Sequence, residues 1–178
     1  RETLYEKGIP YTMLASDMEL RRKSIFFLGQ TLEALRRENP DLDFHFWTLI
    51  HERGNTPDRR PVVDLKFLRG LVDRTLRNYE LSGIYVVEAQ GLGNHPGKGE
   101  GRTIMVHAHA ITWSADKFDM AAAEKGVNSS DAWHNPEGAT PVIIKPIPQM
   151  PGELAYMAYY LFKPPYDVTM MEQRKGGE

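Results

Sequence analysis

The chain has 178 residues and a net charge of −2, with 41% hydrophobic and 26% charged residues, as is usual for one soluble globular domain. This balance excludes a strongly basic protein, and no apolar run approaches the roughly 20 residues that cross a membrane, so we expect no membrane partner. The absence of cysteine excludes disulfides, thiolate metal sites and cysteine nucleophiles, and it favours a cytoplasmic protein.

The first part of the chain predicts a helix, a strand and a second helix. A capping-box pattern at residues 16–19 opens the first helix, an apolar residue then recurs every three or four positions, and Asn39-Pro40 ends it. Residues 43–50 alternate as a strand does, and the polar residues 52–60 are expected to form a loop. Pro61 suits the first turn of the second helix, whose apolar residues share one face: Leu65, Leu68, Val72, Leu76 and Tyr79.

The second part predicts a strand pair at 84–90 and 103–113, joined by a glycine-rich connection at 91–101 that we expect to be mobile. The remaining predicted elements are a helix at 114–125 ended by Gly126, a strand at 140–147, and a helix that opens at Pro151 and closes at Pro164-Pro165. Strands connected partly by helices and partly by a hairpin indicate an α+β fold, with a central antiparallel sheet and flanking helices.

A pair of histidines in the second strand of the hairpin is the main candidate for a functional site. His107 and His109 are two residues apart, so in a strand their imidazoles point to the same face. Two neighbouring imidazoles are a common pair of metal ligands. The pattern is short, and packed histidines would produce it too. We expect the other histidines to be surface or packing residues: His45, His51, His95 and His134.

Glu88 in the partner strand is a candidate third ligand. It shares a face with Ile84, Val86 and Gln90, and a carboxylate in an otherwise apolar strand is costly unless it is paired or coordinated. With the two histidines it would form a mixed site that leaves positions for water and a phosphate oxygen, and that would accept Mn²⁺ or Mg²⁺. The alternative is an edge glutamate that reaches solvent.

The last predicted helix carries candidate nucleophiles. Tyr156, Tyr160 and Lys163 are spaced so that they form one stripe along the helix. A tyrosine beside a cation and a metal loses its proton more easily and can act as a nucleophile, and the lysine could neutralise developing charge. Rings that only pack into the core would give the same pattern, and we expect that role for Tyr159.

Basic residues cluster between positions 59 and 77. The candidates for contacts with a nucleic-acid backbone are Arg59, Arg60, Arg69 and Arg74. A solvated helix face would explain the same cluster equally well.

Three short segments, in this order, resemble the motifs of the HUH endonucleases, and specifically the rolling-circle replication initiators of plasmids and single-stranded DNA phages. Phe46-Trp47-Thr48-Leu49 is similar to the first motif, His107-Ala108-His109 to the second and Tyr160-Leu161-Phe162-Lys163 to the third. Glu88 resembles the glutamate that many members place on the neighbouring strand. The Tyr-x-x-x-Tyr spacing of Tyr156 and Tyr160 is similar to phage-type initiators, although Tyr159 stands where those usually have a lysine.

The resemblance implies a ferredoxin-related, RRM-like sheet and a nuclease domain at 41–166, between an N-terminal helical extension at 1–40 and a flexible tail at 167–178. It implies a nickase that cuts the single-stranded DNA of an origin, a hairpin or an exposed strand. Tyr160 would attack and form a 5′-phosphotyrosine, with Tyr156 as a second nucleophile, Lys163 assisting, and Mn²⁺ or Mg²⁺ held by His107, His109 and Glu88. A host helicase and a host polymerase would be its partners.

Two other functions are compatible with the same residues. One is a non-catalytic single-stranded nucleic-acid-binding domain of RRM-like shape, whose binding would ignore EDTA. The other is a metal-dependent phosphoesterase in which the tyrosines only pack. Because the chain begins at Arg1 rather than Met, we also expect it to be part of a longer protein.

Overall fold

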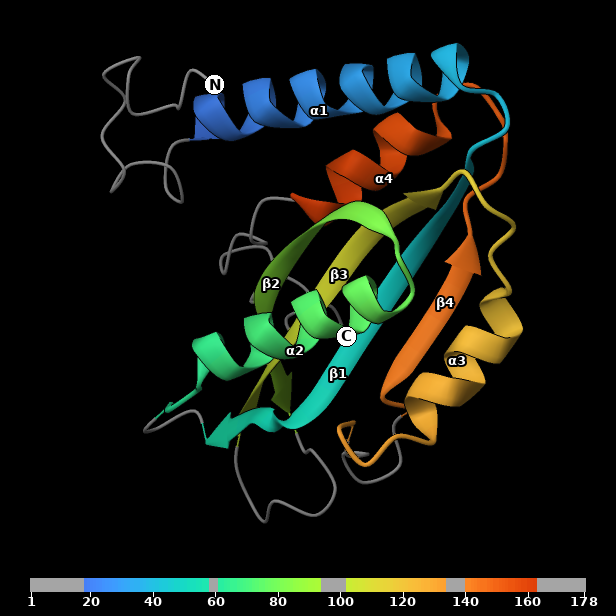
Figure 1. The fold of residues 1–178 in the computed structure, drawn as a ribbon. Coiled ribbons are helices and arrows are strands. Elements are labelled where there is room, and N and C mark those ends of the chain that lie inside the picture. Colours follow the sequence, from blue (N-terminus) through green and yellow to red (C-terminus); the bar gives the residue numbers. More distant parts are fainter. Residues whose placement is uncertain (1–17, 58–60, 94–101, 134–139, 163–178) are drawn as a thin grey trace, which may run out of the picture.

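Four antiparallel strands form one sheet in the order β2-β3-β1-β4 (Figure 1). The computed structural model describes residues 18–57, 61–93, 102–133 and 140–162. The strands are β1 (Asp43–Pro57), β2 (Ser82–Gly93), β3 (Arg102–Ser114) and β4 (Val142–Pro146). The helices are α1 (Met18–Glu38), α2 (Leu65–Asn78), α3 (Met120–Asn128) and α4 (Glu153–Leu161).

The connections between these strands follow the ferredoxin-like pattern. Helix α2 connects β1 to β2, a hairpin connects β2 to β3, and α3 connects β3 to β4, which gives the order β-α-β-β-α-β. The two central strands are β1 and β3. The edge strands are β2, which pairs with β3, and β4, which pairs with β1. The predicted α+β class, with a central antiparallel sheet and flanking helices, is therefore confirmed.

The two faces of the sheet are covered by different helices. On one face, here called the α2/α3 face, Trp47 and Leu49 of β1 pack with apolar residues of α2 and α3. On the opposite face, here called the α4 face, Phe44 and Ile111 pack with Leu154, Ala158 and Leu161 of α4. Because side chains alternate along a strand, the odd-numbered residues 107–111 of β3 face α4 while the small residues Ala108 and Ala110 face the other core.

Helix α1 packs on α4, so that α4 lies between α1 and the sheet (Figure 1). Gly29 allows the close approach, because a Cβ there would lie 3.1 Å from the Cα of Ala155. The carboxylate of Glu33 accepts hydrogen bonds from the backbone N–H groups of the first turn of α4. The predicted N-terminal helix thus exists, and it contributes Leu32 to the core on the α4 face.

Several predicted boundaries differ from the structure. Residues 52–57, predicted as part of a loop, continue β1, and the backbone of residues 55–57 pairs with residues 103–105 of β3. The hairpin strands likewise extend into the predicted connection, to Gly93 and from Arg102. The mobility expected for the rest of that connection falls on 94–101, outside the described residues, as does the capping box at 16–17.

Helix starts were also misplaced. Helix α2 begins at Leu65 rather than at Pro61, since the side chain of Asp64 accepts a hydrogen bond from the N–H of Phe67 and caps the helix. Asp119 caps α3 in the same way, so that α3 runs from Met120 past Gly126 to Asn128. In the part of the chain that is described, no helix is long and apolar enough to cross a membrane.

Candidate metal centre and tyrosine

Two neighbouring strands supply the candidate metal ligands. His107 and His109 alternate with Ala108 on β3 and therefore point to the α4 face. Glu88 on β2 stands directly opposite His107 in the strand register. The three predicted ligands are thus brought together on one face of the sheet.

The ligand atoms converge on a common point. The Oε1 atom of Glu88 lies 3.0 Å from Nε2 of His107 and 3.2 Å from Nε2 of His109, and the two Nε2 atoms are 3.1 Å apart. His107 and His109 are buried, with exposed fractions of 4% and 5%. The side chain of Glu88 has 23% of its surface exposed. Of the three candidate ligands, Glu88 is therefore the one most exposed to solvent.

Hydrogen bonds cannot account for all three of these contacts. A carboxylate oxygen only accepts, and an Nε2–H group cannot donate to a second Nε2–H, so at most two of the three contacts can be hydrogen bonds. A cation between the three atoms would satisfy all of them. Three neighbouring corners of an octahedron, with metal–ligand distances of about 2.1 Å, would be about 3.0 Å apart. The observed separations of 3.0–3.2 Å fit that arrangement, which leaves three corners for other ligands.

Residues of β1 hold the ring of His109. The hydroxyl oxygen of Thr48 lies 3.2 Å from Nδ1 of His109, and the ring of Phe46 stacks on the imidazole with centroids 5.3 Å apart. The Nδ1 atom of His107, by contrast, is buried without a hydrogen-bond partner among the described residues. The two imidazoles are thus supported differently.

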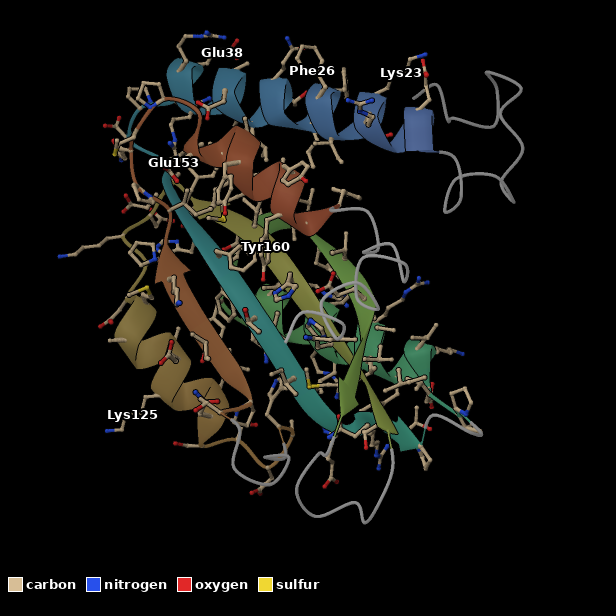
Figure 2. All side chains as sticks on the ribbon, turned by 180° about the vertical axis from the view of Figure 1, so that it is seen from behind. Lys23, Phe26, Glu38, Lys125, Glu153 and Tyr160 are labelled. Carbon is tan, nitrogen blue, oxygen red and sulfur yellow. The ribbon has the colours of Figure 1, made fainter. Side chains whose placement is uncertain are left out.

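Tyr160 lies beside this centre. It extends from α4 toward the sheet (Figure 2), and its ring is edge-on to His109, with centroids 5.5 Å apart and an interplanar angle of 70°. It also makes an edge contact with Phe46 at 5.5 Å. The candidate nucleophile and the candidate ligands are therefore on the same face of the sheet.

The other two tyrosines of α4 are more exposed. Tyr156 is 58% exposed, and Tyr159, which we expected in the core, is 52% exposed. Tyr159 lines a groove of about 980 Å³ between α1 and α4, so the prediction of a core role for it was wrong. Lys163 lies outside the described residues.

The two candidate DNA-binding arginines that the structure describes do not share the face of the metal centre. Arg69 and Arg74 are exposed on α2, which packs on the α2/α3 face. Arg59 and Arg60 lie outside the described residues. The exposed Lys145 of β4, in register with Phe46, is on the α4 face instead, because its neighbour Ile144 is buried on the other face. Sequence reasoning missed Lys145, although alternation along the strand would have placed it.

The remaining histidines that the structure describes are packing residues, as predicted. His45 makes an edge contact with Phe118 at 4.8 Å, and His51 makes edge contacts with the rings of Phe67 and Trp133. Burial lowers the pKa of His45, although the charge of Asp43 acts in the opposite direction. Both rings are buried on the α2/α3 face, away from the candidate metal centre. His95 and His134 lie outside the described residues.

Comparison with known proteins finds no protein-family model and no curated protein that matches the chain. A solved structure that is similar to it is that of the hypothetical protein ORF119 from Sulfolobus islandicus rod-shaped virus 1. The TM-score is 0.40 at 11% sequence identity, and the similarity covers 78% of this chain and 95% of that protein.

Proposed function

We propose that this chain is an HUH-type nickase and strand transferase of single-stranded DNA, which starts rolling-circle replication by attaching Tyr160 to a 5′ phosphate. The observation that carries the proposal is the contact between Tyr160 and His109, which holds a phenol next to a cluster of two imidazoles and one carboxylate. A phosphoesterase whose tyrosines only pack does not need a tyrosine at that position. A binding domain does not need the converging ligands either.

The protein residues have distinct roles in the proposed reaction. Glu88, His107 and His109 would hold Mn²⁺ or Mg²⁺, and the metal when bound would supply a Lewis acid for the negative charge of the scissile phosphate. The carboxylate favours such hard cations. Phe46 packs against both His109 and Tyr160 and would keep the tyrosine in line with the site.

The covalent step exchanges one phosphate ester for another. The phenol oxygen of Tyr160 forms a bond to phosphorus while the bond from phosphorus to the 3′ oxygen breaks. The phenol proton is released to solvent and the leaving oxygen takes up a proton, which gives a 5′-phosphotyrosine and a free 3′ hydroxyl. A host polymerase would extend that hydroxyl, and a host helicase would separate the strands. Attack of a 3′ hydroxyl on the phosphotyrosine reverses the reaction and joins a strand.

Single-stranded DNA would reach the centre over the exposed part of the α4 face. Glu88 is the most exposed of the three candidate ligands, and Lys145 on the same face offers a cation for the DNA backbone. Arg69 and Arg74 would contact the DNA only if it continued around the edge of the sheet to the other face, and their role stays a prediction.

The test is to incubate the 178-residue chain with Mn²⁺ and a mixed single-stranded oligonucleotide library. We expect a protein band of lower mobility on a denaturing gel, which EDTA prevents and which the double variant Tyr156→Phe, Tyr160→Phe does not form. An adduct on the double variant would refute the proposal. Cleavage without an adduct would instead support the phosphoesterase, and DNA binding that is insensitive to EDTA, without cleavage, would support the binding domain.

A further inference from the structure

The second ring nitrogen of His109, Nδ1, lies beside a hydroxyl group, whereas no described residue contacts Nδ1 of His107 with a polar atom. Thr48 and His109 are directly opposite each other on β1 and β3, and the Thr48 hydroxyl lies 3.2 Å from Nδ1 of His109. Nδ1 of His107 is buried and has no hydrogen-bond partner among the described residues. Among the residues that the structure describes, a polar partner on the second ring nitrogen is therefore found for His109 and not for His107.

A hydroxyl group can donate or accept, so which atom donates in this contact depends on where the proton of the neutral imidazole is located. A neutral imidazole carries its proton on one nitrogen and a lone pair on the other, and only the lone pair can bind a cation. If Nδ1–H of His109 donates to the Thr48 oxygen, the lone pair is on Nε2, which faces Glu88 and His107. The stacked ring of Phe46 restricts rotation of the same imidazole.

We infer that Thr48 is a positioning residue for the metal centre: it accepts the Nδ1–H hydrogen bond of His109 and so directs the Nε2 lone pair toward the metal. This inference rests on the metal centre of the proposed function and not on DNA cleavage. It assigns a role to the polar residue of Phe46-Trp47-Thr48-Leu49, in which Trp47 and Leu49 face the opposite core.

The test is Mn²⁺ affinity, measured by the electron paramagnetic resonance signal of free Mn²⁺ without DNA. Thr48→Val keeps the size and β-branching of the side chain and removes the hydroxyl, and we expect it to weaken binding about 10- to 100-fold. Thr48→Ser keeps the hydroxyl and should bind within about threefold of the parent chain. Thr56→Val is the matched control, because Thr56 is a buried threonine of the same strand β1 whose hydroxyl also takes part in a hydrogen bond, and it should leave the affinity unchanged.

A second measurement does not depend on metal. The ¹⁵N chemical shifts of His109 in EDTA report which nitrogen is protonated, and we expect the proton on Nδ1 in the parent chain and a mixture of the two forms in Thr48→Val. The inference is overturned if Thr48→Val binds Mn²⁺ as the parent does, or if the parent carries the proton on Nε2. A parent chain that binds no Mn²⁺ would refute the metal centre and this inference together. Mn²⁺ binding without a DNA adduct would refute only the nicking activity.

Discussion

Tyr160 of α4 and His109 of β3 are in edge-to-face contact, with their ring centroids 5.5 Å apart. The ring of Phe46 on β1 contacts both of them. Three residues that are far apart in the sequence therefore meet at one place on the α4 face. This convergence distinguishes Tyr160 from the other tyrosines of the same helix.

The two candidate nucleophiles should not contribute equally. Tyr160→Phe removes the phenol beside His109, and we expect DNA adduct formation to fall more than about 1000-fold, as happens when a nucleophile is removed. Tyr156 is 58% exposed, so Tyr156→Phe should leave the initial rate of adduct formation within about threefold. The measurement is a time course on a denaturing gel.

Tyr159→Phe is the matched control for that experiment, since Tyr159 lies on the same helix and lines the groove toward α1. It should behave like the parent chain. If Tyr156→Phe abolished the adduct while Tyr160→Phe retained it, the assignment of the nucleophile would be reversed.

The contact between α1 and α4 should contribute measurably to stability. The Glu33 carboxylate accepts hydrogen bonds from the N–H groups of Gly152, Leu154 and Ala155, at 3.1, 3.1 and 3.4 Å, where α4 has no capping side chain of its own. Glu33→Gln removes a negative charge from this helix N-terminus, and we expect the free energy of unfolding to fall by about 1–2 kcal/mol. Urea denaturation would measure the change.

Glu38→Gln serves as the control for Glu33→Gln, because Glu38 is exposed at the end of the same helix. It should change the free energy of unfolding by less than about 0.5 kcal/mol. An equal effect of the two substitutions would argue against a specific cap on α4.

Part of the candidate site could be predicted from the sequence, because side chains alternate between the two faces along a strand. This alternation placed His107 and His109 on one face of their strand, and it placed Glu88 on the same face of its own strand as Ile84 and Val86. The register between the two strands was not predictable, because a long hairpin connection does not fix which residues stand opposite each other. The structure supplies this register, with Glu88 opposite His107.

Other features could not be deduced because they depend on tertiary contacts. The polar residues 52–57 lack the alternation of a half-buried strand, and only their pairing with β3 makes them one. The apolar stripe of the first helix predicted a buried face but not its partner, α4. The roles inferred for Phe46 and Thr48 required knowing that β1 lies next to β3.

An irregularity in β1 next to His107 should be sensitive to a single methyl group. The strand register shifts between Ile50 and Asn55, and a Cβ at Gly54 would overlap the carbonyl oxygen of Val106. Gly54→Ala should therefore lower the free energy of unfolding by about 1–3 kcal/mol, the usual cost of overpacking, and it should weaken Mn²⁺ binding by displacing the backbone before His107. Urea denaturation in EDTA and Mn²⁺ titration would measure these two effects.

Gly70→Ala is the same chemical change at a position with space. Gly70 is inside α2, and nothing lies within 4 Å of a Cβ placed there. Alanine in a helix interior is favoured over glycine by about 0.5–1 kcal/mol, so this variant should be more stable than the parent. If both variants changed stability in the same direction, the close approach at Gly54 would not be the cause.

Titration of His45 should make the stability depend on pH. Burial lowers the pKa of His45 in the folded chain, against an opposing effect of Asp43, so the unfolded chain binds this proton more strongly. The contribution of neutral His45 to stability is therefore complete above the unfolded value of about 6.5 and is lost as the pH falls from there toward the lower folded pKa. His45→Leu should abolish the loss of stability at low pH that is due to residue 45.

The measurement is the free energy of unfolding in urea and EDTA at several pH values between 5 and 8, for the parent chain and His45→Leu. Other titrating groups act in both chains, so the difference between them isolates His45. We expect the difference in free energy of unfolding to be constant above about pH 7.5. Below about pH 6.5 the parent should lose stability relative to His45→Leu, because its unfolded state binds the proton of His45 more strongly than its folded state does. A difference that stays constant over the whole range would show that His45 binds its proton equally well in both states.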